Sequence, residues 1–308
     1  MAIDVYTSGL TDPMVRLIER SGGRVRAPDD PPGRGPAVFF WTQGFPRQAI
    51  GPLLHGHPDI TWVHSIGAGA DHTIPVVPPH LVLTRGPGPA GTPVGEFAVA
   101  AVLMLCRRMP LLFSLHQARA WAKVQALAFA EVRVAILGFG PIGRTVARHL
   151  DRLGMTVEVV RRVPGSGTTP AQHPTAALAE VLSRSTGLVV ACALTPCTAG
   201  ILDGRMLRSI APGGFLVNVA RGGLVDHLAL AELLRSGHLG GAVLDTTEPE
   251  PLPHDHPLRS APNCLVTSHT AAYADDFPMA AARLFCDNLR RFAAGLPLRH
   301  VVDRQLGY

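Results

Sequence analysis

Lysine is almost missing from this chain, because Lys123 is the single lysine among 28 lysine and arginine residues. The arginines are spread along the chain, and no basic run longer than a pair accompanies the formal net charge of +5. A nucleic-acid interface needs basic side chains gathered on one face. The sequence therefore does not support nucleic-acid binding, and no nucleic-acid partner is expected.

Cysteine is scarce, and long apolar runs are missing. The five cysteines are odd in number and lack paired CxxC spacing, which argues against a disulfide framework or a metal site. No apolar stretch reaches the length of a membrane span. The amino terminus, Met-Ala-Ile-Asp-Val-Tyr, lacks the basic and apolar regions of a signal peptide. We expect a soluble, cytoplasmic protein with no metal and no membrane partner.

The length of 308 residues exceeds the usual size of one domain, so two domains are expected. Hydrophobic residues make up 47% of the chain and charged residues 17%, which is a globular composition. Apolar runs alternate with helical patterns over residues 2–110 and again from residue 132, which favours an α/β fold with two parallel sheets. We assign residues 94–273 to one domain, and residues 1–93 with 274–308 to a second, discontinuous domain.

The same patterns predict the individual elements. Strands are expected at residues 3–7, 37–41, 60–64 and 81–83, and then at 132–137, 157–160, 188–193, 215–219, 242–244 and 265–268. Helices are expected at residues 93–108, 142–153, 228–236 and 276–294. The last helix is expected to return to the first domain.

A glycine-rich turn, Gly138-Phe-Gly-Pro-Ile-Gly143, follows one apolar strand and opens a helix, with the next strand about eighteen residues further on. This arrangement is typical of a dinucleotide site. Gly138 allows the tight turn, Gly140 lets the main chain approach a pyrophosphate, and Gly143 permits close packing of helix on strand. The candidate cofactor-binding residues of the turn are Gly138, Gly140, Pro141, Ile142 and Gly143.

The end of the next strand distinguishes two nicotinamide cofactors. NAD sites place an acidic residue there, which accepts a hydrogen bond from the ribose 2′-hydroxyl. This chain has Arg161 at that position and Arg162 after it. Two guanidinium groups suit the 2′-phosphate of NADP through charge-assisted hydrogen bonds, whereas a carboxylate would repel it. NADP(H) is therefore favoured, with NAD(H) as the alternative.

Three polar residues, far apart in the sequence, each come after a short apolar run that is typical of a buried parallel strand. In open α/β sheets, ligands bind at the carboxyl ends of such strands. A cation, a carboxylate and an imidazole gathered there can hold an anionic substrate and transfer a proton. These residues are Arg221 after the run 215–220, Glu250 after the run 241–244, and His269 after the run 264–267.

Around these residues the sequence resembles the D-isomer-specific 2-hydroxyacid dehydrogenase family, and within it the glyoxylate/hydroxypyruvate reductases. The similar segments are Leu216–Asp226 with the catalytic arginine, Leu244–Pro253 with the catalytic glutamate, Ser268–Ala272 with the catalytic histidine, and Ser65–His72 as the substrate-binding loop. In the glutamate segment the second acid after the aspartate is the catalytic one, which gives Glu250 rather than Glu248. The resemblance extends over nearly the whole chain.

The resemblance implies two doubly wound parallel-sheet domains, a Rossmann cofactor domain inserted in a flavodoxin-like substrate domain, and a homodimer with contacts around the helix 94–108. It implies reduction of a 2-keto acid to a D-2-hydroxy acid, in which Arg221 binds and polarises the substrate, His269 is the general acid and base, and Glu250 orients His269 and favours its charged form. The implied substrate contacts are Gly67, Ala68, Gly69, Arg221 and His269. Further implied cofactor contacts are Thr195, Ala220 and Asp245, the last with the nicotinamide carboxamide.

The substrate itself stays open, because Ser268 replaces the proline that usually precedes the histidine and Tyr273 follows where small residues are common. A phosphite- or phosphoglycerate-type dehydrogenase is one alternative, but its more highly charged substrate calls for a further cation, and the loop around Ala68 contains none. Formate oxidation is disfavoured, because family members with that activity carry glutamine in place of the glutamate. A catalytically silent, dinucleotide-sensing protein, similar to the corepressors of this fold, is the alternative outside enzymes.

Overall fold

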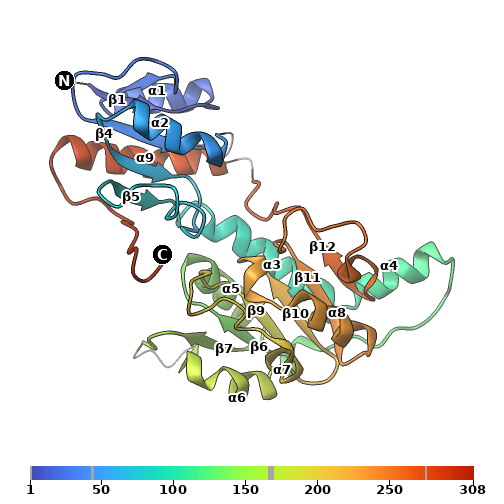
Figure 1. The fold of residues 1–308 in the computed structure, drawn as a ribbon. Helices are drawn as coiled ribbons and strands as arrows, with labels where there is room; N and C mark the ends of the chain where they lie inside the picture. The colour runs from blue at the N-terminus through green and yellow to red at the C-terminus, as the bar shows by residue number, and fades with distance from the viewer. Residues whose placement is uncertain (1, 43–44, 166–169, 275) are drawn as a thin grey trace. The chain divides into compact units, whose positions relative to one another are not determined.

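The computed structural model describes residues 2–42, 45–165, 170–274 and 276–308, and it divides the chain into two compact units. Unit 1 consists of Met1–Ala90 with Ala274–Tyr308, and unit 2 of Gly91–Tyr273. Each unit is built on a parallel sheet flanked by helices (Figure 1). The predicted α/β class with two parallel sheets is therefore confirmed.

The sheet of unit 1 has five parallel strands in the order β2-β1-β3-β4-β5, which is the flavodoxin-like order. The strands are β1 Ile3–Tyr6, β2 Gly23–Arg26, β3 Ala37–Trp41, β4 Ile60–Ser65 and β5 Val82–Arg85. The helices are α1 Asp12–Arg20, η1 Arg47–Ala49, α2 Ile50–Gly56 and α9 Phe277–Ala293.

Helices cover both faces of this sheet. Successive side chains of a strand point to opposite faces, so neighbouring residues of β3 contact different helices. On β3, Phe39 joins an apolar cluster with Ile50 and Leu53 of α2. The next residue, Phe40, stacks on Phe285 of α9 with 4.3 Å between ring centroids. The last helix of the chain thus forms part of the core of unit 1.

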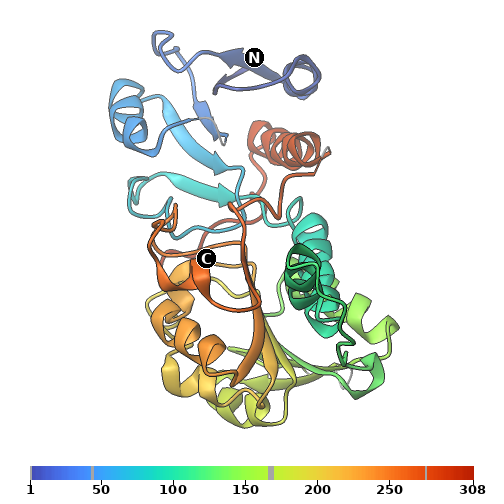
Figure 2. The ribbon, with the colours of Figure 1, turned by 90° about the vertical axis from the view of Figure 1, so that its right-hand side faces the viewer.

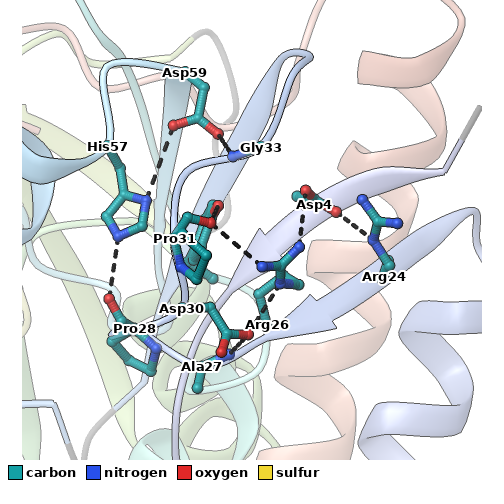
Figure 3. Close-up of polar contacts among 11 residues, drawn as sticks. Asp4, Arg24, Arg26, Ala27, Pro28, Asp30, Pro31, Gly33, His57 and Asp59 are labelled. Atoms are coloured by element: carbon teal, nitrogen blue, oxygen red, sulfur yellow. Dashed lines mark hydrogen bonds and ion pairs between the residues drawn. The ribbon is translucent and has the colours of Figure 1, made fainter.

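Ion pairs fix the edge of the sheet at β1 and β2 (Figure 3). Arg24 Nε donates a hydrogen bond to Asp4 at 2.6 Å, and Arg26 Nε donates one to Asp30 at 2.9 Å. The hydrogen bond from Arg26 holds the pKa of Asp30 below its usual range. These contacts attach the loop after β2 to the strands.

His64 on β4 is a buried, uncharged imidazole. Its ring lies near Phe40 and Phe285, and its Nδ1 is 2.7 Å from Thr84 Oγ1, which also accepts a hydrogen bond from Trp62 Nε1 at 2.7 Å. A hydroxyl has one donor and two acceptor positions, so Thr84 Oγ1 can bond both rings at once. Burial, with a smaller effect of His300, lowers the pKa of His64 to about 3.

This burial predicts acid sensitivity of folding. The unfolded chain binds a proton at His64 below about pH 6.5, whereas the folded chain does not until about pH 3. The stabilisation is therefore complete above pH 6.5 and is lost as the pH falls toward 3. Between pH 7.5 and 5 the free energy of unfolding should fall by about 2 kcal/mol on account of this group. Urea unfolding of His64→Gln should lack that slope, and an exposed His55→Gln control should keep it. Equal slopes in all three proteins would contradict the prediction.

The sheet of unit 2 has seven parallel strands in the order β12-β11-β10-β9-β6-β7-β8. The strands are β6 Arg133–Leu137, β7 Thr156–Arg161, β8 Ala171–Pro174, β9 Gly187–Val190, β10 Gly214–Asn218, β11 Leu239–Leu244 and β12 Cys264–Val266. Counted from β6, this order contains the Rossmann order 3-2-1-4-5-6 with one more strand. The order reverses between β6 and β9, where such sheets bind a cofactor.

The helices of unit 2 lie on both faces of its sheet. They are α3 Gly91–Cys106, α4 Met109–Gln117, η2 Phe129–Glu131, α5 Pro141–Arg152, η3 Thr175–Ala177, α6 Leu178–Ser183, α7 Gly204–Arg208, η4 Gly222–Leu224, α8 His227–Arg235 and η5 Pro257–Ser260. Figure 2 shows α3 (teal) on one side of the sheet and α8 (orange) on the other. Gly95 of α3 lies directly against Thr145 of α5, so these two helices pack closely.

Several predicted boundaries are wrong by two or three residues. The helix expected at 93–108 runs from Gly91 to Cys106, and it ends because Arg108 adopts a left-handed conformation with φ 53°. A separate helix, α4, then begins at Met109. The strand expected at 188–193 ends at Val190, and the strand expected at 265–268 ends at Val266. Within the described residues no single helix has the length and apolarity of a membrane span, although α3 and α4, bent by 64°, meet that criterion as a pair.

Candidate active site

The carboxyl ends of β10, β11 and β12 lie in register at one edge of the sheet in unit 2. Asn218, Leu244 and Val266 are equivalent positions of these neighbouring strands. One residue further on, Asp245 N donates a hydrogen bond to Asn218 O, and Thr267 N donates one to Leu244 O, each at 2.9 Å. The segments that leave the sheet here side by side are those that carry Arg221, Glu250 and His269.

His269 and Glu250 form a hydrogen-bonded pair. His269 Nδ1 lies 3.0 Å from Glu250 Oε2, and the other oxygen of Glu250 accepts a hydrogen bond from Thr247 N at 3.0 Å. An ionised carboxylate only accepts, so Nδ1 carries the hydrogen. The His269 side chain is 48% exposed, so its other nitrogen, Nε2, is within reach of a small molecule.

Asp245 stabilises the turn that carries His269 through hydrogen bonds. Its buried carboxylate accepts hydrogen bonds from Thr267 Oγ1 at 2.6 Å, Thr270 N at 2.8 Å and Ala271 N at 3.0 Å. His269 has a φ of 53°, a conformation that a non-glycine residue keeps only where its surroundings hold it. The three bonds supply this restraint. Asp245 Oδ2 retains one acceptor position, so its implied contact with the nicotinamide stays a prediction.

Asn218 shapes the turn that carries Arg221. Its Nδ2 donates to Arg221 O at 2.9 Å, and its Oδ1 accepts from Ala220 N at 3.0 Å. Arg221 Nη1 donates to Ala220 O at 2.8 Å, so the guanidinium is bound to the end of its own strand. The next residue, Gly222, touches the glutamate loop, because a Cβ there would overlap the peptide between Thr247 and Glu248. The arginine turn and the glutamate loop are therefore in main-chain contact.

The glycine-rich turn forms a main-chain cradle at the start of α5. Gly138 has a φ of 102°, and a Cβ on it would overlap the main chain of Ala191 and Cys192. Gly143 packs on the carbonyl of Gly138, where a Cβ would also overlap. Among the described residues, nothing lies within 4 Å of a Cβ built on Gly140. The first and third glycines thus serve packing, whereas the second faces open space beside a helix N-terminus, which fits the pyrophosphate of a dinucleotide.

Four other predicted cofactor residues follow strands of the same sheet. Pro141 and Ile142 form the first turn of α5. Thr195 follows β9, with its N–H bonded to Thr198 Oγ1 at 2.8 Å, and Ala220 is buried after β10. Pro141, Ile142 and Thr195 follow β6 or β9, the strands between which the order reverses, and Ala220 follows β10, the neighbour of β9.

Two guanidinium groups converge on Phe139, the second residue of the glycine-rich turn. Arg161 at the end of β7 has its guanidinium carbon 6.0 Å from the centre of the Phe139 ring, and its Nη1 is 3.5 Å from Gln172 of β8. Arg144 in the first turn of α5 donates from Nη1 to Phe139 O at 2.9 Å. Arg162 is exposed just beyond Arg161. Arg144 was not predicted, although its place directly after the third glycine puts it at the helix N-terminus.

The loop Gly67–Ala68–Gly69 lies in unit 1, after β4. Gly86 N donates to Gly67 O at 2.9 Å, and Arg85 Nη1 donates to Ala68 O at 2.7 Å. The end of the neighbouring strand β5 therefore holds this loop. The loop itself contains no cation, but the structure places Arg85 directly against it, which removes the objection to a more highly charged substrate. The sequence feature that could have identified Arg85 is its position at the end of an apolar run.

Burial raises the pKa of the Cys192 and Cys264 thiols to about 12. Both are neutral thiols at physiological pH and lack the thiolate that nucleophilic catalysis needs. No group of three or more histidine, cysteine, aspartate or glutamate side chains within the described ranges could hold a metal ion.

Comparison with protein families matches residues 99–271 to the NAD-binding domain of D-isomer specific 2-hydroxyacid dehydrogenases. The match covers more than half of the chain and includes the glycine-rich turn, Arg221, Glu250 and His269.

Individual relatives extend the likeness to most of the chain. Glyoxylate/hydroxypyruvate reductase A of Photorhabdus laumondii is 35% identical over 221 residues, which are 71% of this chain and 69% of that protein. The (S)-sulfolactate dehydrogenase of Chromohalobacter salexigens is 33% identical over 248 residues, or 78% and 79% of the two chains. The crystal structure of a D-isomer specific 2-hydroxyacid dehydrogenase from Xanthobacter autotrophicus Py2, in complex with NADPH and MES, has a TM-score of 0.88 and 31% identity, and the match covers 100% of this chain and 99% of that one.

Proposed function

Because the chain belongs to the D-isomer-specific 2-hydroxyacid dehydrogenase family and is thereby an NAD(P)-dependent oxidoreductase, we propose that it reduces a 2-keto acid to a D-2-hydroxy acid with NADPH. The observation that carries this proposal is the hydrogen bond of 3.0 Å between His269 and Glu250, at the same sheet edge as the Arg221 turn. Unit 2 would hold the cofactor, and the loop of unit 1 would bind the substrate.

Arg221 would bind and polarise the substrate. A 2-keto acid carries a carboxylate next to its carbonyl, and the planar fork of a guanidinium matches this pair of oxygens. The same positive charge stabilises the negative charge that develops on the carbonyl oxygen during reduction. Main-chain N–H groups of Gly67–Gly69 would hold the substrate carboxylate. The hydride comes from NADPH, when that cofactor is bound at the glycine-rich turn.

His269 would supply the proton. With its Nδ1 hydrogen donated to Glu250, the protonated ring presents Nε2–H, which transfers a proton to the substrate oxygen. The opposite charge of Glu250 stabilises the imidazolium, and the Thr247 N–H fixes the carboxylate in turn. The pair thus holds the proton at one defined atom.

The preference for NADPH would come from the guanidinium groups around Phe139. Arg161 occupies the place where NAD sites carry a carboxylate, and Arg162 and Arg144 add positive charge at the same turn. Charge-assisted hydrogen bonds from these groups would bind the 2′-phosphate, which NADH lacks. The relative from Xanthobacter autotrophicus Py2, crystallised with NADPH, supports this preference. NADH would be used less efficiently.

An Arg161→Asp variant should lose this preference. Replacing a charge-assisted donor by a repelling carboxylate is expected to lower kcat/KM for NADPH by about 100-fold, while kcat/KM for NADH is kept or rises. Initial rates with both cofactors at one fixed keto-acid concentration give the ratio. Arg148→Asp, an exposed position on α5, controls for the general change of charge. An unchanged ratio in Arg161→Asp would remove Arg161 from the cofactor site.

The contact between Gly222 and the glutamate loop predicts a position-specific effect of one methyl group. Gly222→Ala must displace the peptide between Thr247 and Glu248, so kcat/KM should fall by about 10- to 100-fold as Glu250 moves. A Cβ on Gly223 would meet only the Leu194 side chain, at 3.3 Å, so Gly223→Ala should stay within about two-fold of the parent. Equal activity of the two variants would show that the contact does not position the site.

A substrate panel tests the proposed function directly. NADPH consumption is followed at 340 nm with glyoxylate, hydroxypyruvate and larger 2-keto acids, and the hydroxy acid is analysed for its D configuration. Turnover with at least one of them supports the proposal. Tight NADPH binding without turnover of any would reject it in favour of the dinucleotide-sensing alternative.

We also propose a homodimer, with its contact in the surroundings of the helix expected at residues 94–108. Most residues of helix α3 are buried, so α3 itself offers little surface to a partner. In contrast, α4 has no buried residue, and it extends away from the sheet of unit 2 in Figure 1. The apolar side chains exposed on α4 and the segment after it are Leu111, Leu112, Phe113 and Trp121. Such a patch is typical of a subunit interface. Sedimentation equilibrium of the full chain should give twice the chain mass, and a monomer at all concentrations would reject the proposal.

A further inference from the structure

Among the residues that the structure describes, the half-buried cation Arg85 has no acidic partner. It ends β5, and its main-chain N–H donates to His300 O at 3.1 Å. Within the described part of the chain, its guanidinium makes one hydrogen bond, from Nη1 to Ala68 O at 2.7 Å, and no carboxylate lies within ion-pair distance of it. The acid on the adjoining loop, Asp71, is 3.8 Å from His72 Nδ1.

Placing a charge out of water without a counter-charge is unfavourable. Burial accordingly lowers the pKa of Arg85, and burial, followed by the positive charge of Arg85, lowers the pKa of His300. Tyr308 acts on the pKa of Arg85 in the opposite direction, with a smaller effect than burial. An anion that binds beside Arg85 would offset this penalty.

We propose that Arg85 is a specificity-determining residue that binds a second anionic group of the substrate, so that the preferred substrate is a 2-keto acid with an additional carboxylate or sulfonate. This inference rests on the proposed function, in which the main chain of Gly67–Gly69 holds the substrate carboxylate. Arg85 is bonded to the middle residue of that loop. A guanidinium has five N–H donors in a planar fork, so one bond to Ala68 O leaves a donor face for an oxyanion.

The test compares 2-keto acids that differ in one anionic group. Pyruvate and hydroxypyruvate carry one negative charge, whereas oxaloacetate and 3-sulfopyruvate carry a second, as carboxylate or sulfonate. The parent enzyme should show a higher kcat/KM for one of the doubly charged acids, and the better of the two identifies the anion. In Arg85→Gln this kcat/KM should fall by about 10- to 100-fold, mainly through KM, while kcat/KM for pyruvate and hydroxypyruvate stays within about three-fold. Glutamine keeps an N–H donor for Ala68 O.

Two further variants separate substrate binding from loop support. Arg85→Lys retains the charge and should keep part of the preference. Arg24→Gln removes one positive charge at the opposite edge of the same sheet and should leave the preference unchanged. An equal loss with singly and doubly charged acids in Arg85→Gln would show that Arg85 only supports the loop, and no preference in the parent enzyme would also overturn the inference. The absence of any NADPH-dependent reduction would instead reject the proposed function itself.

Discussion

His269→Gln is expected to lower kcat by two to four orders of magnitude, because a side-chain amide cannot give up a proton to the substrate oxygen. A positioned general acid contributes about 10²- to 10⁴-fold to the rate. Glutamine has a similar size and is polar, and both residues have a side chain that disfavours a φ of 53°. The loss should therefore reflect chemistry and not the conformation of the turn. NADPH affinity, measured by fluorescence titration, should change by less than about two-fold.

A matched control lies in the same loop region. His254 is exposed and makes none of the contacts described for the Glu250 pair, so His254→Gln should keep the parent kcat. Glu250→Gln, which keeps the shape and removes the charge, should fall between the two, because the imidazolium loses its counter-charge but keeps its proton. If His269→Gln retains more than about a tenth of the parent kcat, another group supplies the proton and the assignment is wrong.

The strands that were predicted are those with long apolar runs, and the strands that were missed lie at sheet edges. β10 reads Gly-Phe-Leu-Val-Asn and is buried throughout, as expected of a central parallel strand. β2, Gly-Arg-Val-Arg, and β8, Ala-Gln-His-Pro, pair on one side only and carry polar residues, so their sequences look like loops. Their place in the sheet is decided by pairing with β1 and β7, which no local pattern records.

In the active site, the sequence likewise predicts some features and misses others. Arg221, Glu250 and His269 could be proposed because each stands near the end of an apolar run and within a family segment, and the bond between His269 and Glu250 agrees with that proposal. The contacts that support them could not be predicted, because the approach of Gly222 to Thr247 joins positions 25 residues apart, in the segments that follow two neighbouring strands. Such contacts depend on how neighbouring loops pack.

For the charged residues Arg85 and Asp245, the sequence does not show which groups their side chains contact. Asp245 is expected from the sequence as a cofactor ligand, and in the structure its carboxylate also accepts three hydrogen bonds that hold the histidine turn. Arg85 is one of many scattered arginines in sequence, and only the pairing of β4 with β5 brings it to the Ala68 carbonyl. The sequence identifies the sign of each charge, but the fold determines which groups the charged side chain contacts.

The second large effect is expected from Arg221→Lys, which keeps the positive charge and removes the planar fork. Ammonium is a point charge with rotating donors, so it cannot bind a carboxylate oxygen and the adjacent carbonyl oxygen in the same fixed geometry. The variant also lacks the hydrogen bond of 2.8 Å from Arg221 Nη1 to Ala220 O, which holds the guanidinium beside the end of β10. We expect kcat/KM for the keto acid to fall by about 100-fold, with NADPH affinity retained. The exposed Arg235→Lys on α8 is the matched control and should be neutral.

The double variant Arg221→Lys/His269→Gln distinguishes joint from independent action. Both side chains are proposed to act on the same substrate oxygen, one by stabilising its developing charge and the other by protonating it. Once the proton donor is missing, a misplaced cation should matter less, so the combined loss in kcat/KM should be smaller than the product of the two single losses. Losses that multiply would mean that the two residues act at separate steps or on separate atoms. A wild-type rate in Arg221→Lys would mean that charge alone suffices, and that the fork plays no part in binding the keto acid.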